Sequence, residues 1–229
     1  MKASSMRELI INFHGIGTPH PTVAAEERCY WWKLEAFTLL LDRVAARPAD
    51  ANPKVLLTFD DGNESDATLV LPELLRRGLT ASFFVCAGRV GRRNYLDHLM
   101  MRDLTASGMV IGSHGMHHVD WCALPEAALD NEIGVARRKL EDVIQQPVRA
   151  VAIPFGSYNR RVLKRLKAEP LECIFTSDRG HARLGSRMKP RQTVLADMQD
   201  REIWPELLKT PSAWTSARRS LSRLYKQIR

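Results

Sequence analysis

Two carboxylates stand side by side after an apolar run in LLTFDDGNES, residues 56–65. Val55 to Phe59 is typical of a buried strand, and Asp60 and Asp61 follow it directly. A strand that ends in a turn would account for these residue types on structural grounds alone. Adjacent carboxylates also suit hydrolysis, in which one binds a metal ion and the other takes a proton from water.

A second group of ionisable residues lies in VIGSHGMHHVDW, residues 110–121. His114 and His118 are four residues apart and follow a predicted strand, so one helical turn would place both imidazoles on the same side. Two neutral histidines and one aspartate make the three-ligand set of a catalytic zinc site, with coordination positions left open. We therefore predict one divalent metal ion, with Zn²⁺ favoured over Co²⁺, Ni²⁺ or Fe²⁺.

The aspartates and histidines can form one site only if the strands and helices of the fold bring them together. The chain alternates short apolar strands with amphipathic helices. The predicted strands lie near residues 9–13, 55–59, 81–86, 109–111, 148–153, 173–176 and 193–195. The predicted helices span residues 34–44, 69–77, 95–107, 125–144 and 160–167, with Gly78 and Gly108 as left-handed caps. The alternation predicts an α/β fold with a parallel sheet, open or closed into a barrel, whose active site gathers at the carboxyl ends of the strands.

Composition narrows the classes of protein. The length of 229 residues and the 45% hydrophobic content fit one α/β domain of barrel size. The apolar run near the N-terminus, Leu9 to Phe13, is too short for a signal peptide or a membrane span. The four cysteines form no CxxC pair, which indicates reduced thiols and leads us to expect a cytoplasmic protein.

The net charge of +8 is concentrated at the C-terminus. Residues 211–229 hold five basic side chains and no acidic one, so we predict no nucleic-acid partner. Trp214, Leu221 and Tyr225 fall near one helical face with arginines around it. That pattern is compatible with peripheral contact with the inner face of the membrane, but it favours an ordinary packed helix.

Three motifs in order resemble one family. TFDDG (58–62), SHGMHH (113–118) and IPFGSYN (153–159) are similar to the first three motifs of the polysaccharide deacetylases, the NodB homology domain of carbohydrate esterase family four. The resemblance runs from His14 to Val194. It implies a deformed (β/α) barrel and metal-dependent removal of an acyl group, such as N-acetyl, from a sugar.

The resemblance also implies roles for individual residues. By motif position Asp60 is the catalytic base, and the metal ligands are Asp61, His114 and His118. Pro154 and Phe155 occupy the place of the family's substrate wall, where the backbone amide of Phe155 would help to bind the developing oxyanion.

The chain departs from the family pattern in three places. Ala152 and Phe155 replace the usual arginine and tyrosine, and no Leu-x-His follows Pro154 to supply the catalytic acid. His14 follows a predicted strand and precedes the aspartate motif, which resembles the arrangement in the circularly permuted branch that deacetylates poly-N-acetylglucosamine, and we assign it as the acid. The alternatives are a strand-end histidine bonded to backbone, or an acid supplied by His181.

Three residues complete the predicted substrate side. Arg191 stands directly before the last predicted strand and would hold Asp60 in place, with Arg149 as the alternative. Trp31 lies in the aromatic cluster after a long loop, where it would either face a pyranose ring or pack in the core. Phe155 is the third.

We therefore expect residues 1–200 to form the barrel and residues 201–229 a helical extension packed on it or trailing it. The expected activity is N-deacetylation of an amino sugar in a glycan or a carrier-linked precursor. The alternatives are another sugar amide hydrolase, such as a deformylase or a deacylase of a lipid- or nucleotide-linked sugar, and a glycan-binding relative without turnover.

Overall fold

A computed structural model describes residues 6–21, 23–199, 202–209 and 224–226. Nine strands form one sheet in the order β7-β1-β2-β3-β4-β5-β6-β8, with β9 paired to β1. The strands are β1 (Arg7–Phe13), β2 (Lys54–Asp61), β3 (Ala81–Val85), β4 (Val110–Ser113), β5 (Ala150–Ala152), β6 (Cys173–Thr176), β7 (Ala182–Arg183), β8 (Met188–Pro190) and β9 (Gln192–Thr193). All described pairings are parallel except β1 with β7.

One short segment nearly closes this sheet into a barrel. Its first half, β8, pairs with β6, and its second half, β9, pairs with β1 on the other side of the gap. Arg191 lies between the two halves, and its backbone N–H donates to Thr176 O at 2.9 Å. The predicted fold class, a deformed (β/α) barrel, is confirmed. The sequence pattern showed only the end of this segment, because β8 has just three residues and contains a lysine.

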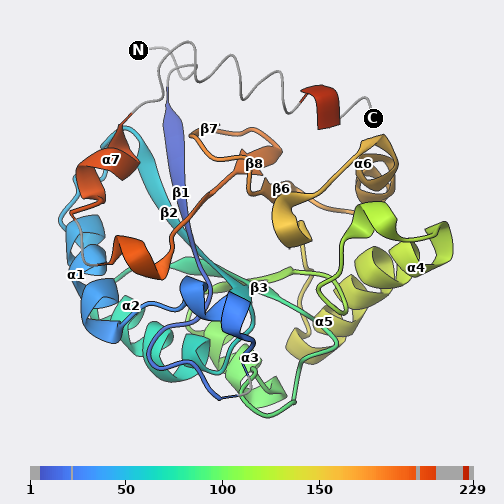
Figure 1. Ribbon diagram of the computed structural model, residues 1–229, viewed down its shortest axis with the longest axis horizontal. Helices are drawn as coiled ribbons and strands as arrows, with labels where there is room; N and C mark the ends of the chain where they lie inside the picture. Colours follow the sequence, from blue (N-terminus) through green and yellow to red (C-terminus); the bar gives the residue numbers. More distant parts are fainter. Residues whose placement is uncertain (1–5, 22, 200–201, 210–223, 227–229) are drawn as a thin grey trace.

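Helices surround the outside of the strands (Figure 1). The α-helices are α1 (Leu34–Ala45), α2 (Leu71–Arg76), α3 (His98–Ala106), α4 (Glu126–Asp130), α5 (Ala136–Ile144), α6 (Arg160–Lys167) and α7 (Trp204–Leu208). Two π-helical turns, η3 (Asp66–Val70) and η5 (Asn131–Val135), lead into α2 and α5, and 3₁₀ turns include η2 (Ala25–Tyr30) and η6 (Pro154–Gly156). Gly78 and Gly108 have φ of 63° and 80°, as left-handed caps require.

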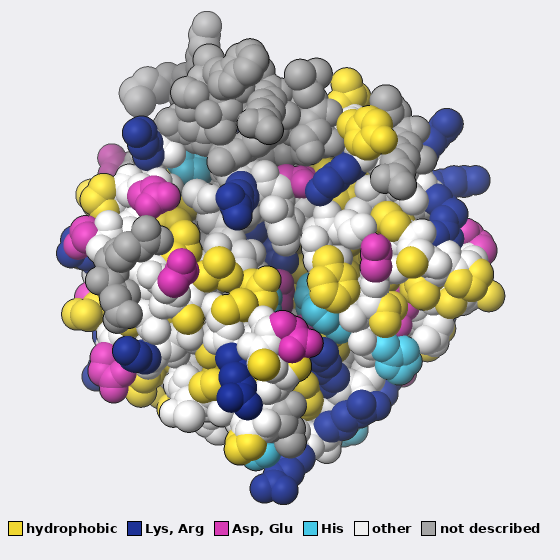
Figure 2. Space-filling model, viewed as in Figure 1, with side chains coloured by type: hydrophobic (Ala, Val, Ile, Leu, Met, Phe, Trp, Pro, Cys, Tyr) yellow, Lys and Arg dark blue, Asp and Glu magenta, His cyan; other side chains and the backbone are white. Residues whose placement is uncertain are grey.

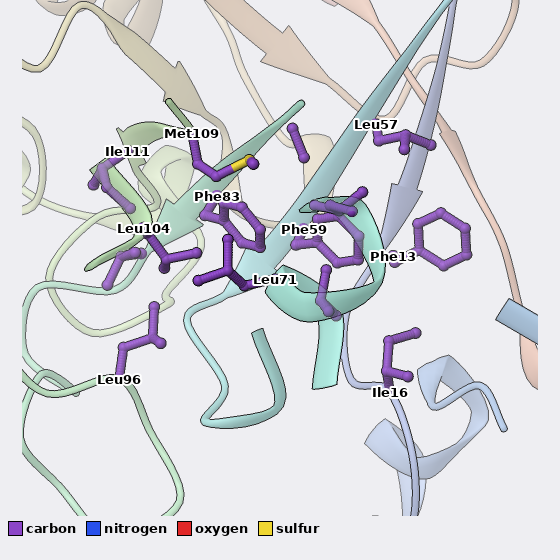
Figure 3. Close-up of a cluster of buried hydrophobic side chains, with 14 of the residues drawn as sticks. Phe13, Ile16, Leu57, Phe59, Leu71, Phe83, Leu96, Leu104, Met109 and Ile111 are labelled. Atoms are coloured by element: carbon purple, nitrogen blue, oxygen red, sulfur yellow. The ribbon is translucent and has the colours of Figure 1, made fainter. Parts of the chain in front are cut away.

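Alternation along the strands separates two apolar layers. Phe13, Phe59 and Phe83 point outward and pack against α1, α2 and α3, where Figure 3 shows them in a row with Leu71 and Leu104 around them. Side chains of the opposite parity, from strands around the whole sheet, meet each other inside the barrel: they are Ile10, Phe84, Ala150, Ala152, Phe175 and Ala182. The interior is therefore filled, and a site can form only at an end.

The described part of the predicted extension, residues 202–209, packs on the barrel. Ile203 and Leu207 are buried in the main core, and Leu207 O lies 3.2 Å from His181 Nε2. Most of the predicted tail, including Trp214 and Leu221, lies outside the described residues. Within the described ranges, the helices lack the length and apolar character needed to cross a membrane.

Candidate active site

Asp60 and Asp61 end β2 and line the same cleft. Neighbouring residues of a regular strand point to opposite faces, so two adjacent side chains need a break in the strand to reach one cleft. Asp61 supplies it with φ of 79°, a left-handed conformation that is unusual for a residue with a side chain. Gly62 continues the turn with φ of 72°. Strain of this kind is typical of functional sites.

Asp60 is buried and clamped by an arginine. Arg191 Nη1 lies 2.6 Å from Asp60 Oδ1 and Arg191 Nη2 lies 2.8 Å from Oδ2, so the guanidinium binds both oxygens. Asn12 Nδ2 also donates to Oδ2, at 3.0 Å. Burial alone would raise the pKa of Asp60, but the charge of Arg191, followed by that of His114, outweighs it and holds the pKa well below its usual value. Asp60 is therefore an ionised carboxylate in a fixed orientation.

Arg191 is wholly buried, with 1% of its surface exposed. Its guanidinium lies above the rings of Phe84 and Phe175, at 5.3 and 6.0 Å from their centroids. This burial leaves no surface for the substrate contact that we predicted, so Arg191 is a positioning residue for Asp60. The alternative, Arg149, lies 3.3 Å from Glu172 on the surface.

His114 presents Nε2 to the site because its other nitrogen is occupied. Nδ1 lies 2.8 Å from Ala152 O, which favours the tautomer with the proton on Nδ1 and the lone pair on Nε2. Burial lowers the pKa of His114 to about 4, so the ring is neutral at neutral pH. Ala152 thus supplies a backbone oxygen where the family pattern has an arginine.

His118 reaches the same place by a turn, which corrects the predicted helical geometry. Residues 114–118 contain no helix, and Gly115 and His118 have φ of 84° and 57°. The buried Glu132 holds this turn: its carboxylate accepts the backbone N–H groups of Met116 at 2.9 Å and of His117 at 3.1 Å. His117 itself is exposed.

The three predicted metal ligands converge. One ligand atom from each of Asp61, His114 and His118 lies within 4.8 Å of the others. Asp61 Oδ1 is 3.7 Å from His118 Nε2, and His114 Nε2 is 3.8 Å from Oδ2 of Asp60. One carboxylate oxygen and two neutral imidazole nitrogens fit a divalent ion with open positions, beside a carboxylate that is not a ligand.

A cleft of about 690 Å³ opens over this group. The other predicted site residues His14, Trp31 and Phe155 line it, together with Tyr30, Tyr95 and Arg89. Figure 2 shows a hollow near the middle of this face, with histidine at its wall and hydrophobic side chains around it. The cleft therefore combines the ionisable groups with aromatic faces that suit a sugar ring.

The aromatic residues divide between cleft and core. The Tyr30 ring lies 4.6 Å from that of His14, and the Phe155 ring lies 4.6 Å from that of His118. Trp31 is partly exposed, whereas Trp32 is 2% exposed and donates from Nε1 to Leu195 O at 3.0 Å. Trp31 is therefore open to the cleft, and its neighbour Trp32 packs in the core.

The candidate acids lie in different places. His14 lines the cleft, and its Nδ1 is buried without a hydrogen-bond partner among the described residues. His181 is buried against Leu207 and does not line the cleft. The geometry therefore leaves His14 as the histidine beside the three ligands and Asp60.

Sequence reasoning missed several residues of this site. Asn12 accepts from Arg191 at 2.7 Å and donates to Asp60, and a buried amide inside an otherwise apolar strand was the available signal. Arg89 lies 3.1 Å from Asp61, and Glu132 shapes the histidine turn. Neither follows a motif, because each is placed by tertiary contacts.

Comparison with known proteins decides the family. The family model for polysaccharide deacetylases matches residues 48–174, more than half of the chain. The chain belongs to the polysaccharide deacetylase family. The match spans the strands that carry both aspartates and both histidines.

Similar family members come from several bacteria. The peptidoglycan-N-acetylglucosamine deacetylase of Bacillus cereus is 29% identical over 128 residues, which cover 55% of this chain and 58% of the relative. The chitooligosaccharide deacetylase of Sinorhizobium fredii is 29% identical over 123 residues, 53% of this chain and 55% of the relative. The chain thus matches about half the length of these relatives.

A solved structure supports the same fold. IcaB from Ammonifex degensii superposes with a TM-score of 0.75 at 20% identity, over 89% of this chain and 97% of that one. At this identity the likeness establishes the deacetylase barrel and leaves activity to be argued from the site.

Proposed function

We propose that this polysaccharide deacetylase family member hydrolyses the N-acetyl group of an amino sugar, in a glycan or a carrier-linked precursor, with the help of one divalent metal ion. The observation that carries the proposal is the ionised Asp60, held beside the converging ligands Asp61, His114 and His118 in an aromatic cleft. The activities named for the Bacillus and Sinorhizobium relatives, on peptidoglycan N-acetylglucosamine and chitooligosaccharide, support this substrate class.

The ligands fit Zn²⁺, which when bound would polarise an amide carbonyl and lower the pKa of a bound water to about 7. Asp60 takes the proton of the attacking water, because Arg191 keeps it ionised and Asn12 fixes its orientation. The backbone amide of Phe155 is the proposed donor to the developing oxyanion. Trp31 and Tyr30 form the aromatic side of the sugar site.

His14 is the proposed acid that delivers a proton to the leaving amine. An amine is a poor leaving group unless a proton reaches it as the carbon–nitrogen bond breaks. His14→Ala should keep fold and metal content and lose about 10²- to 10⁴-fold in kcat, the usual contribution of a general acid. Full turnover in this variant would remove His14 from the mechanism.

The test of the whole proposal is acetate release from acetylated amino-sugar oligomers, measured alongside the metal content. Purified protein should contain about one divalent ion per chain, and His114→Ala should lose both the ion and turnover. Hydrolysis of formylated or longer-acyl sugars in preference to acetylated ones would favour the alternative amide hydrolase. Glycan binding without any turnover at full metal content would favour the non-catalytic relative.

The proposed location is the cytoplasm, with peripheral contact with the inner face of the membrane through the basic C-terminal segment. The four free cysteines support it, because secreted proteins usually pair theirs. Cell fractionation and binding to anionic vesicles, with and without residues 211–229, would test the location and the membrane contact separately.

A further inference from the structure

The adjacent carboxylates Asp60 and Asp61 each face an arginine, but the two pairs differ. The Arg191 side chain is 0% exposed and binds both oxygens of Asp60. The Arg89 side chain is 18% exposed, contacts one oxygen of Asp61 at 3.1 Å, and lines the cleft. Arg191 cannot move away from Asp60 without disrupting the packing of the barrel, whereas Arg89 lies at the edge of the open cleft.

The backbone of Arg89 is fixed by the histidine turn. Ala87 N donates to Gly115 O and Gly88 N to Met116 O, both at 2.9 Å. A Cβ at Gly88 would lie 2.5 Å from Met116 O, so only glycine permits this approach. The guanidinium of Arg89 lies over the Tyr95 ring, 5.1 Å from its centroid. Arg89 is therefore held close to the proposed ligands by the same contacts that place His114 and His118.

Arg89 contacts the Asp61 oxygen that lies nearest to His118. Asp61 Oδ1 is the atom 3.1 Å from Arg89 Nη1, and it is also the atom 3.7 Å from His118 Nε2. A side chain that supports a metal ligand from outside usually bonds the atom turned away from the metal. Here the guanidinium approaches the oxygen that faces the histidine, and a second positive charge would meet it there.

We propose that Arg89 competes with the divalent ion for Asp61, and so stabilises the metal-free site and sets the metal affinity lower than the three ligands alone would give. This inference rests on the proposed metal-dependent function. The physical reason is charge: without the ion, Arg89 offsets a buried carboxylate that lies next to a second one, and with the ion present the same guanidinium repels it. Arg89 is thus a positioning residue whose removal has opposite effects on the two states.

The test is direct titration of metal-stripped protein with Zn²⁺ against a chromophoric chelator, without substrate. Arg89→Met should bind Zn²⁺ about 10- to 100-fold more tightly, the size of effect that outer contacts of metal ligands usually have. Its metal-free form should also melt at a lower temperature than the wild type. Arg89→Lys keeps the charge, so its Zn²⁺ affinity should stay closer to that of the wild type. The control variant Arg92→Met, at an exposed arginine three residues later, should have the wild-type Zn²⁺ affinity.

Equal or weaker Zn²⁺ binding in a folded Arg89→Met would overturn the inference. Weaker binding is the result expected if Arg89 supports Asp61 as a metal ligand and does not compete with the ion. Arg89→Gln serves as the second neutral variant if Arg89→Met does not fold, and it must show the same tightening. A wild type that binds no more Zn²⁺ than His114→Ala would instead refute the metal site itself. The two failures are therefore distinguishable.

Discussion

Two acid–base pairs lie inside the barrel, and a single segment supplies the cation of both. Lys189 in β8 pairs with Glu8 in β1, and Arg191, two residues later, pairs with Asp60 at the end of β2. Residues two apart in an extended chain point the same way, so both cations face the interior. The apolar layer around Ile10, Phe84 and Phe175 separates them.

The two ion pairs are buried to a similar extent, but their carboxylates receive different numbers of hydrogen bonds. The Glu8 and Lys189 side chains are 7% and 8% exposed, and the interaction described between them is one contact between an ammonium and a carboxylate oxygen. Asp60 receives two bonds from Arg191 and one from Asn12, and it lies beside His114 at the floor of the cleft. Burial alone therefore does not mark a functional carboxylate. Asp60 differs from Glu8 in its fixed orientation beside an open cleft.

Asp60→Asn should have the largest effect. The variant keeps the shape of the side chain and loses the group that takes the proton, so kcat should fall about 10²- to 10⁴-fold while Zn²⁺ binding persists. Glu8→Gln, the matched change at the other pair, should leave kcat near the wild-type value. Comparable loss of metal in Asp60→Asn and Asp61→Asn would contradict the separation of base from ligand.

Arg191→Met should change the pH profile. Without the guanidinium, burial raises the pKa of Asp60, so the base stays protonated to higher pH. The acidic limb of kcat/KM should move toward neutral pH, and the variant should lose about 3–5 kcal/mol of stability, as when one partner of a buried pair is removed. The surface variant Arg149→Met should show neither change, and an unshifted limb in folded Arg191→Met would argue against the positioning role.

The Glu8–Lys189 pair should affect stability alone. Glu8→Met or Lys189→Met by itself should cost about 3–5 kcal/mol in the free energy of unfolding, because each leaves a buried charge without its partner. The double variant should be neutral or up to about 4 kcal/mol more stable, with kcat unchanged. A double variant that folds and loses turnover would show that the two ends of the barrel are coupled.

Lys226 should have the smallest effect. Its Nζ lies 2.8 Å from Asp178 Oδ1 and 3.0 Å from Gly156 O, next to Phe155 at the rim of the cleft. The Lys226 side chain is 33% exposed, so Lys226→Met should cost at most about 1 kcal/mol of stability. We expect a small rise in KM with kcat unchanged. A fall in kcat comparable with that of Asp60→Asn would place the C-terminal segment within the catalytic machinery.

Much of the fold could be predicted from the sequence because the signals that define its helices and strands are local. The helix from Arg160 to Lys167 and the strand from Cys173 to Thr176 have the predicted bounds, since apolar spacing and turn residues act within a few positions. The irregular turn inside the predicted helix of residues 125–144 could not be predicted from the sequence. It is a π-helical turn that carries Glu132 to the histidine turn, a contact between distant segments.

The sequence by itself determined which chemistry was available. Two adjacent carboxylates at a strand end and two histidines at another predict a metal-assisted hydrolytic site, because the carboxyl ends of parallel strands in a barrel lie at the same end. Only the tertiary structure decided where each side chain lies and what it contacts. Asn12, Arg89 and Arg191 differ in their burial and in the groups they contact. Closure of the barrel brings Arg191 to Asn12, 179 residues away in the chain, whereas Arg89 reaches Asp61 from just after the neighbouring strand. Electrostatic interactions and hydrogen bonds depend on distances in three dimensions, and the order of residues in the sequence does not give those distances.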